Sequence, residues 1–476
     1  MVRLAPAGDR LLDRLLSGEA VPPVAAASRL ARRLIDGGMA HPRPVLVGGG
    51  LPTETANDDG THREGLPPPH MTGGDDVTAV VPVRDQAAGL GATLAALGPT
   101  AAVVVVDDGS TTGVVAPAPA DAVPTLVRHA FSAGPGAARN TGWRSATTPL
   151  VAFVDAECEP RSGWLDHLLP LFSDPTVGAV APRVVSRPVP GAPPWLVAYE
   201  AARSCLDLGG REGPVRPRSW VPYAPTAALV VRRRALEDVG GFDEALRTGE
   251  DVDLVWRMNA AGWRVRYQPA ATVTHPVRPS LGGWLRQRIG YGRSAAPLAR
   301  RHGGAVAPLS VSLWSAGVWA LVVTGHPNAG AVVTAGSAAA LAKSTAPAPA
   351  PAEPGRMSGP LPVPKAALAH LAVTGHLRSG EAAAAALVRA WWPVAFAGAV
   401  ASRRARKVVA AAIMLPAVAD WARSRPRMDL TRWLAAHLAD DLAYGVGVWA
   451  GCVTERSLSA LRPVATRRSS KTSPFR

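Results

Sequence analysis

Cysteines and aromatic residues are few in this chain of 476 residues, and acidic residues are fewer than basic ones. The three cysteines, Cys158, Cys205 and Cys452, are too widely spaced for a disulfide framework or a zinc pattern, which favours a reducing cytosolic setting. Lysine plus arginine number 51 against 36 acidic residues, and the net charge of +15 suits an anionic substrate, lipid or nucleic acid. Basic runs interleaved with aromatic residues are missing, so we expect no nucleic-acid partner.

The N-terminal residues have no apolar core of the kind that a secretory signal needs, because Met1–Leu16 is amphipathic and of mixed charge. Leucines at helical spacing within residues 11–16 and 30–35 predict two helices, and Gly37-Gly38 predicts the end of the second. We interpret residues 1–47 as a helical segment that resembles an incomplete winged-helix-like module. Residues 48–76 are rich in Gly, Pro, Thr and Asp without apolar periodicity, and predict a linker.

Short apolar runs that alternate with helical patterns begin at Val77 and predict an α/β domain over residues 77–302. The predicted strands are 77–83, 101–106, 123–127, 150–154, 177–185 and 227–231. Helices are expected between them, and right-handed connections bring the carboxyl ends of parallel strands to one edge. The expected fold class is therefore α/β with a doubly wound sheet.

We expect residues 303–476 to form a hydrophobic, mostly helical C-terminal region. Its apolar runs are mostly short. Val306–Gly325 is largely uncharged and just long enough to cross a bilayer. If it spans, the basic residues Arg300, Arg301 and 403–407 place the protein on the cytoplasmic side of the cell membrane. A buried helical subdomain explains the same pattern, and both interpretations stay open.

Acidic residues follow two of the predicted strands. The apolar run 150–154 ends at Asp155 and Glu157, and the run before Asp107 and Asp108 ends in the same way. Ligands of open α/β sheets bind beyond the carboxyl ends of the strands. Asp155 and Glu157 are spaced to share a divalent cation, which suits a diphosphate, while Asp107 and Asp108 can accept hydrogen bonds from a base or a ribose. Solvated acidic turns are the alternative for both.

Arg139 and Asn140 stand at the start of a predicted helix, where a nucleotide or a phosphate can bind. Glu250, Asp251 and Asp253 occupy the first turn of a later helix, where one carboxylate can serve as a general base. Capping of the helix is the alternative for any one of these acids. His275 follows an extended segment and is a candidate metal ligand or a structural histidine.

The order of these motifs resembles glycosyltransferase family 2, whose members are inverting enzymes with the GT-A fold. The matching elements are Val80–Arg84, Asp107–Ser110, Ala138–Asn140, Asp155–Glu157, Gly241–Asp243 and Glu250-Asp251. The resemblance implies a UDP-sugar donor bound by Pro82, Arg84, Asp107, Asp108, Arg139, Asn140 and Asp155. It also implies a divalent metal, Mg²⁺ or Mn²⁺, held by Glu157 and His275, and Asp251 as the base beside Glu250. Glu157 stands where the family usually has an aspartate.

Segments outside this core resemble a narrower group, the glycosyltransferases of the mycofactocin system. They are Leu11–Leu16, Ala40–Pro44, Ala390–Pro393, Ser402–Arg406 and Asp440–Trp449. This resemblance implies transfer of glucose from UDP-glucose, as β-linked oligoglucose, onto premycofactocin, a small peptide-derived redox cofactor. Aromatic and arginine side chains suit such an acceptor, and the candidates are Trp220, Tyr223, Arg286 and Arg288.

Two alternatives stay open from the sequence. A membrane-associated glycosyltransferase with a polyprenyl-phosphate or cell-wall acceptor explains the hydrophobic C-terminal region equally well. A non-catalytic scaffold that binds a sugar nucleotide keeps the acids at 107–108 but needs no base, and the full set of acids argues against it.

Overall fold

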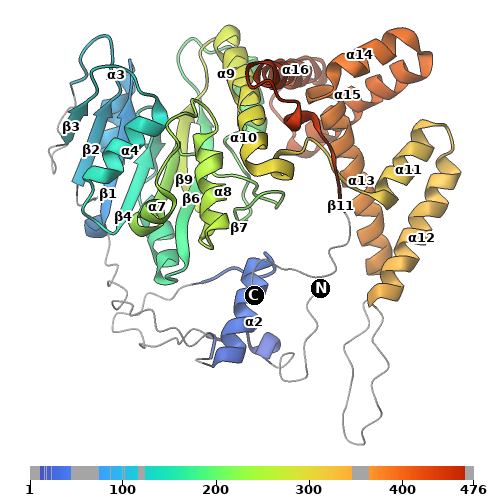
Figure 1. Cartoon of the computed structure of the whole chain (residues 1–476), viewed down its shortest axis with the longest axis horizontal. Coiled ribbons are helices and arrows are strands. Elements are labelled where there is room, and N and C mark those ends of the chain that lie inside the picture. The colour runs from blue at the N-terminus through green and yellow to red at the C-terminus, as the bar shows by residue number, and fades with distance from the viewer. Residues whose placement is uncertain are drawn as a thin grey trace, which may run out of the picture.

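The computed structural model describes residues 11–43 apart from 16, 18 and 23, residues 74–115 apart from 86, 99 and 101, and residues 124–345 and 364–466. Figure 1 shows an α/β domain on the left, a helical region on the right and a short helical segment below the sheet. The predicted linker lies outside the described residues except for 74–76.

The N-terminal segment packs on the α/β domain through helix α2 (Ala25–Asp36), which confirms the second predicted helix and its end at Gly37. Its buried face consists of Ala27, Leu30, Ala31 and Leu34. Asp36 accepts a hydrogen bond of 2.8 Å from Nε of Arg264, at the first residue of strand β9 (Arg264–Pro276). His275 lies at the other end of β9, on the order of 30 Å away for an extended strand. The segment therefore docks far from the predicted metal ligand.

The first half of the sheet consists of parallel strands with continuous apolar sequences, as expected for strands covered on both faces. In spatial order they are β3 (Thr125–Arg128), β2 (Ala102–Asp107), β1 (Val77–Val83) and β4 (Leu150–Val154). Every residue of β4 is buried, whereas β3 is a mostly exposed edge strand. Over the described residues the strand therefore lies one residue later than the predicted 123–127, and its weak pattern reflects the edge position.

The second half of the sheet is mixed. It continues with β8 (Ala228–Arg232), β6 (Val177–Arg187), β9 and β5 (Glu159–Pro160), and β7 (Gly213–Pro214) pairs with β9. Strand β8 runs antiparallel to β4 and β6. Because Val154 pairs with Ala228, the loop that enters β8 lies beside the carboxyl end of β4. This antiparallel pairing, which the sequence did not predict, adds residues 223–227 to the functional edge.

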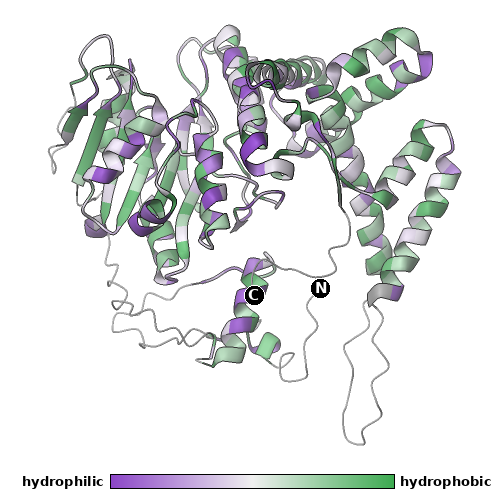
Figure 2. Ribbon diagram, in the orientation of Figure 1, coloured by the Kyte–Doolittle hydropathy of each residue, from purple (hydrophilic) through white to green (hydrophobic). Residues whose placement is uncertain are grey.

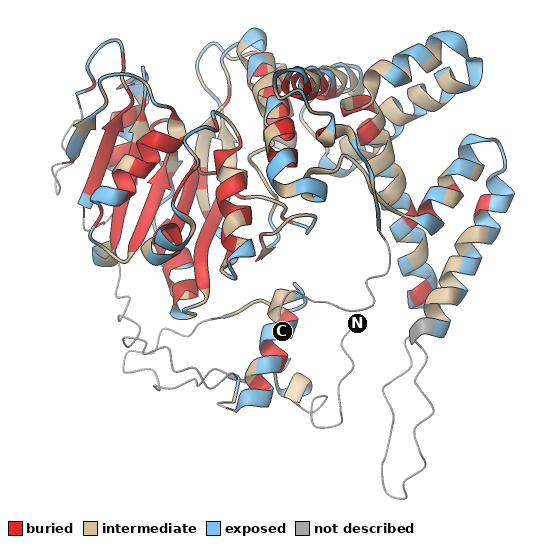
Figure 3. Cartoon of the chain, viewed as in Figure 1, coloured by how far each residue is buried: buried red, intermediate tan, exposed pale blue. Residues whose placement is uncertain are grey.

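Helices cover both faces of the sheet. They are α3 (Ala87–Ala96), α4 (Pro135–Ser145), α5 (Trp164–Leu168), α6 (Pro194–Arg203), α7 (Arg233–Val239) and α8 (Glu250–Ala260). One apolar cluster joins α3 and α5 to the sheet, and a second joins α4, α7 and α8. The buried strands between these helices are red in Figure 3. The expected α/β fold, the doubly wound GT-A arrangement with helical regions at both ends of the chain, is confirmed.

The C-terminal region is helical, as expected. Helices α9 (Leu281–Arg293) and α10 (Ala295–His302) end the α/β domain. The helices of the C-terminal region are α11 (Leu313–Val323), α12 (Pro327–Thr345), α13 (Lys365–Arg389), α14 (Trp392–Ala401), α15 (Arg403–Ser424) and α16 (Leu430–Thr454). A small parallel pair joins β10 (Ser310–Ser312) to β11 (Val464–Thr466). In Figure 2 the hairpins α11–α12 and α14–α15 project from the body and carry many hydrophobic residues.

Helix α16 lies unusually close to α9. A Cβ atom on Gly447 would come within 2.2 Å of the carbonyl oxygen of Ile289, and one on Gly292 within 2.1 Å of that of Tyr444. Such distances leave no room for any side chain larger than hydrogen. The contact ties the C-terminal region firmly to the α/β domain.

The predicted membrane span at 306–325 is interrupted. Residues Ser310–Ser312 are extended and pair with β11, and helix α11 has 11 residues, about 16 Å of the roughly 30 Å that a bilayer core requires. Within the described ranges, no single helix is both long and apolar enough to cross a membrane. Helices α13 and α14 are long and apolar enough for a membrane span only when they are taken together. The chain bends by 88° at the break between them.

Candidate active site

A cavity of about 660 Å³ lies beyond the carboxyl end of β4. The α/β domain contributes the ends of β4 and β9 and the start of α8, and the C-terminal region contributes α13 and α16. The predicted site residues that line it are Arg139, Asp155, Glu157, Tyr223, Glu250, Asp251, His275 and Arg288. A second cavity, of about 620 Å³ beside Arg43, is lined by none of the predicted site residues.

Arg139 joins two carboxylates that the sequence separates widely. Its guanidinium donates one hydrogen bond of 2.7 Å to Asp155 and another of 2.7 Å to Glu250, 111 residues away. Although burial opposes the charge, these carboxylates raise the pKa of Arg139 above its usual value. Arg139 therefore fixes the end of β4 against the start of α8. Both of its Nη atoms donate to protein carboxylates, so neither is free to bind a sugar donor.

Asp251 follows Glu250 at the start of α8 but forms no ion pair with any residue that the structure describes. Gly249 before them adopts φ 82°, and a Cβ there would lie 2.8 Å from Cβ of Ser294, so the turn into α8 requires glycine. The N–H of Val252 donates a 2.8 Å hydrogen bond to Asp251. Burial and the neighbouring Glu250 raise the pKa of Asp251 to about 7. Such a carboxylate on a cavity wall has the properties of a general base at neutral pH.

Glu157 and His275 meet at the cavity wall, as expected from the sequence. Nε2 of His275 lies 3.0 Å from Oε1 of Glu157, and Arg278 donates a 3.0 Å hydrogen bond to the same oxygen. Burial alone would raise the pKa of Glu157, but His275 and Arg278 hold it at about 2. The carboxylate is thus ionised and fixed in place. Arg278 was not predicted, and only its position after His275 hinted at it.

A carboxylate and an imidazole in contact are a suitable donor set for one divalent cation. The described residues hold no cluster of three or more His, Cys, Asp or Glu arranged for a metal. Mg²⁺, however, is usually held by one or two carboxylates, with substrate phosphate and water completing its coordination. Glu157 and His275, on the same cavity as Asp155, fit that requirement.

Asp107 and Asp108 support the turn after β2. Asp108 accepts hydrogen bonds of 2.8–2.9 Å from His129, Ser132, Ala133 and Gly134, which leaves neither oxygen free. Asp108 therefore holds the loop before α4, and its binding to the donor stays a prediction. Asp107 is fully buried, and its Oδ2 has no hydrogen-bond partner among the described residues, with Nε of Arg128 3.4 Å away. Neither aspartate is among the residues that line the cavity.

Asn140 was also predicted to bind the donor, and that role stays a prediction, because its side chain is engaged by protein groups. Its amide nitrogen donates to the carbonyl of Phe242 at 2.9 Å and to Glu244 at 2.8 Å, and its oxygen accepts from Trp143 and from the N–H of Phe242. All of its hydrogen-bonding capacity serves the turn at Gly241. Pro82 and Arg84 stand at the end of β1, outside the cavity lining, and Arg84 lies 3.6 Å from Asp85.

The four acceptor candidates separate into two pairs. Tyr223 and Arg288 line the cavity, whereas Trp220 is 62% exposed and Arg286 is exposed, both outside it. The acceptor role of Trp220 and Arg286 stays a prediction, without support from the cavity lining. Arg288 and Arg286 share helix α9, and a two-residue step turns a side chain to another face of a helix, which the motif alone could not resolve.

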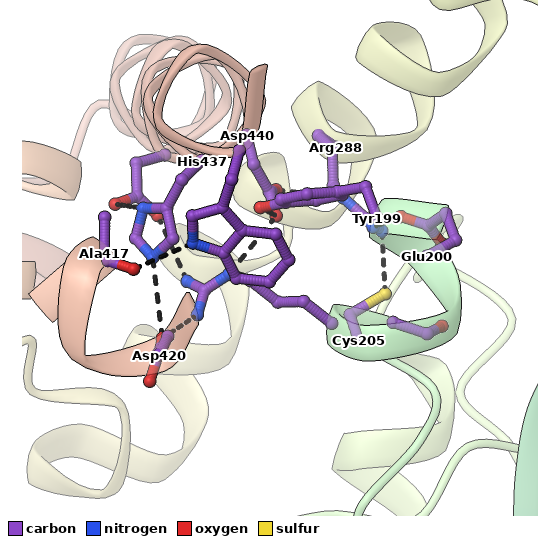
Figure 4. Close-up of polar contacts among 12 residues, drawn as sticks. Tyr199, Glu200, Cys205, Arg288, Ala417, Asp420, His437 and Asp440 are labelled. Atoms are coloured by element: carbon purple, nitrogen blue, oxygen red, sulfur yellow. Dashed lines mark hydrogen bonds and ion pairs between the residues drawn. The ribbon is translucent and has the colours of Figure 1, made fainter. Parts of the chain in front are cut away.

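Residues of the C-terminal region join the site through a buried polar network. Figure 4 shows Asp440 of α16 facing Tyr199 and Arg288 of the α/β domain, while His437 of the same helix points to Asp420. Asp440 accepts a 3.0 Å hydrogen bond from Tyr199 and lies 2.9 Å from Nε of Arg288. Sequence analysis missed the cavity residues Arg247, Arg389, Asp440 and Tyr444. Arg247 stands just before the 249–251 motif, and Asp440 and Tyr444 lie within the segment Asp440–Trp449, so each had a usable signal. Arg389 directly precedes the segment Ala390–Pro393.

A fold of this kind, with carboxylates, a histidine and arginines around one cavity, is that of a glycosyltransferase. Residues 78–240 match the model of "Glycosyl transferase family 2". The chain is 40% identical, over 97% of its length and 92% of theirs, to the "Pre-mycofactocin glycosyltransferase" of two strains of Mycobacterium tuberculosis. It belongs to the family of these pre-mycofactocin glycosyltransferases, within glycosyltransferase family 2.

More distant similarities cover the α/β domain. An N-acetylglucosaminyl-diphospho-decaprenol L-rhamnosyltransferase of Mycobacterium tuberculosis is 36% identical over 29% of this chain and 39% of its own length. Among solved structures, a mannosyltransferase of Pyrobaculum calidifontis in complex with GDP-Man and Mn²⁺ is 22% identical, with a TM-score of 0.37. That likeness covers 56% of this chain and 75% of the mannosyltransferase.

Proposed function

We propose that this protein transfers glucose from UDP-glucose, with inversion at the anomeric carbon, onto pre-mycofactocin, a peptide-derived redox cofactor precursor, as β-linked glucose units. The observation that carries the proposal is the position of Asp251, a carboxylate with a pKa of about 7, on a cavity that also contains Glu157 and His275. The full-length similarity to proteins named for pre-mycofactocin supports the acceptor.

The proposed reaction is a single displacement. Asp251 takes the proton of the acceptor hydroxyl, whose oxygen forms a bond to the anomeric carbon while the bond from that carbon to the diphosphate breaks. UDP leaves with the electron pair of the broken bond, and attack from the opposite face inverts the anomeric configuration. Arg139 keeps Glu250 and Asp155 in place, and the exposed Arg247 is available to the diphosphate charge.

We infer that Glu157 and His275 would hold the divalent cation, Mg²⁺ or Mn²⁺. A cation there neutralises charge on the diphosphate. Activity should disappear in excess chelator and return with Mg²⁺ or Mn²⁺, and Glu157→Ala should raise the metal concentration needed for half-maximal rate. Undiminished activity in chelator contradicts the metal assignment.

The function is tested by incubating the protein with UDP-glucose, a divalent metal and either pre-mycofactocin or a polyprenyl phosphate, and reading product masses. We expect a gain of one or more hexose units on pre-mycofactocin, with β-linkage by NMR. Hexose found only on the lipid defeats the proposal.

A lipid acceptor is the second candidate, because the α14–α15 hairpin exposes apolar side chains that suit a lipid surface. Val394, Phe396 and Val400 of α14 are 67–68% exposed, as is Leu415 of α15. The same assay separates this candidate from the first. Absence of any transfer, together with unchanged UDP-glucose, would instead favour a non-catalytic scaffold.

A further inference from the structure

Part of the cavity wall belongs to the C-terminal region. Arg389 is the last residue of α13, and Asp440 and Tyr444 lie one helical turn apart on α16. A Cβ on Gly445 would come within 2.5 Å of the carbonyl oxygen of Arg389, so α16 approaches the end of α13 as closely as it approaches α9. The position of Arg389 is therefore set by packing and not by a loose chain end.

Most arginines of the cavity are engaged by protein groups. Arg139, Arg278 and Arg288 each use both Nη atoms in bonds to acids or to Cys205. Arg203 is paired with Asp420 and lies 3.6 Å from Asp441.

Arg389 differs from these arginines. Its Nε donates a 2.7 Å hydrogen bond to Asp441, and its guanidinium carbon lies 5.1 Å from the centre of the Tyr444 ring. Neither Nη atom has a hydrogen-bond partner among the described residues, and a third of the side chain is exposed. An anchored guanidinium with its two outer nitrogens unused is arranged to bind an oxygen of a ligand.

Tyrosine rings share the cavity with Arg389 and Asp251. Tyr223, Tyr291 and Tyr444 all line it. The hydroxyl of Tyr223 donates a 2.5 Å hydrogen bond to the carbonyl of Cys205, which fixes its ring. The ring of Tyr444 is the one in contact with the guanidinium of Arg389. The same cavity lining therefore combines aromatic side chains with Asp251 and Arg389.

We propose that Arg389, Tyr444 and Tyr223 form the acceptor subsite, and that it takes a small planar acceptor with an aromatic ring and a carbonyl or carboxylate oxygen. The Nη atoms of Arg389 donate to that oxygen, the tyrosine rings pack on the ring of the acceptor, and its hydroxyl is directed to Asp251. This inference rests on the proposed function, because it assigns the acceptor side of the same site. It makes the C-terminal region part of the binding site.

The test compares Arg389→Gln with Arg286→Gln, a matched change at an exposed arginine of α9 outside the cavity. Loss of a charged hydrogen bond should lower kcat/KM for pre-mycofactocin by about 10- to 100-fold through KM. KM for UDP-glucose and the slow hydrolysis of UDP-glucose without acceptor should stay within about twofold. Arg389→Lys keeps the charge but loses the paired N–H donors of the guanidinium. Its kcat/KM for pre-mycofactocin should lie between those of Arg389→Gln and wild type. Arg286→Gln should resemble wild type.

Calorimetric titration of pre-mycofactocin into the full-length protein saturated with UDP needs no turnover. Arg389→Gln should raise the Kd for pre-mycofactocin by tenfold or more. An unchanged Kd, or equal losses for acceptor binding and donor hydrolysis, overturns the subsite. If Arg389→Gln does not fold, Tyr444→Leu is measured in its place. It should raise the Kd for pre-mycofactocin by several-fold while hydrolysis is kept. An unchanged Kd for this variant also overturns the subsite. Whether wild type glycosylates pre-mycofactocin at all is a separate result, which bears on the proposed function alone.

Discussion

Glu250 and Asp251 are adjacent in sequence but differ in electrostatic surroundings. Glu250 is buried against Arg139 in an ion pair of 2.7 Å, which fixes its carboxylate. Asp251 has hydrogen bonds from backbone groups, and burial beside Glu250 raises its pKa to about 7. Breaking a buried ion pair costs several kcal/mol, so Glu250 is held in its place. This difference supports the proposal that Asp251 is the base and that Glu250 tunes it.

Asp251→Asn should therefore remove most transfer and leave donor binding nearly intact. Loss of a general base costs about two to four orders of magnitude in kcat. The measurement is kcat and KM with UDP-glucose and pre-mycofactocin, with Asp166→Asn, an exposed carboxylate outside the cavity, as the control. Near-wild-type turnover of Asp251→Asn would show that Asp251 only caps α8.

The raised pKa of Asp251 also predicts the pH dependence. A protonated carboxylate cannot accept the acceptor's proton, so kcat should fall as the pH decreases through about 7, by about tenfold per pH unit well below it. In Asp251→Asn the residual rate should lose this dependence. A wild-type rate that stays constant between pH 5 and pH 8 contradicts the assignment.

At the scale of elements, the strands were predictable because burial on both faces leaves a continuous apolar run. Strands β1 and β4 match their predicted ranges. The edge strand β3 was less well placed, since it is mostly exposed. The antiparallel β8 was located but not oriented, because an apolar run of five residues reads the same in both directions.

The contact between α9 and α16 is the element-level feature that we expect to be least tolerant of change. Gly447→Ala would place a methyl group 2.2 Å from the carbonyl oxygen of Ile289, and forced separation of the helices should cost about 1–3 kcal/mol of unfolding free energy. Gly290→Ala in α9 is the control, because no atom lies within 4 Å of its Cβ position. Both are compared by denaturant unfolding and Tm. Equal stability of the two variants contradicts the close packing.

At the scale of the whole molecule, the projecting hairpin α14–α15 combines two features of an interfacial membrane anchor. Its apolar side chains Val394, Phe396 and Val400 are exposed, and exposed basic residues at 403, 404, 406 and 407 begin α15. Each basic residue near an anionic surface contributes about 1 kcal/mol. We propose that the hairpin holds the protein on an anionic membrane surface at the cytoplasmic side, without a single spanning helix.

Flotation with vesicles tests this proposal. The protein should float with anionic vesicles at low salt, much less with zwitterionic ones, and binding should weaken as salt rises. Replacing Phe396 and Val400 with Asp should abolish flotation without changing UDP-glucose hydrolysis. If the wild-type protein does not bind anionic vesicles, the proposed membrane anchor is wrong.

Much of the chemistry was determined by the sequence itself, because strand runs and the acids that follow them are local patterns. The order of Asp155, Glu157, Asp251 and His275 was enough to predict one site, and the structure brings all four to one cavity. Local patterns report burial and period, and parallel strands carry their ends to a common edge.

Only the tertiary structure decided which side chains remain free for a ligand. Arg139, Asn140 and Asp108 have the residue types of donor ligands, yet their hydrogen bonds are used by groups up to 111 residues away. Arg389 joins the site because glycines let α16 approach both α9 and the end of α13. Hydrogen-bond capacity is finite and is assigned in three dimensions, so sequence spacing cannot show which donors the fold has already used.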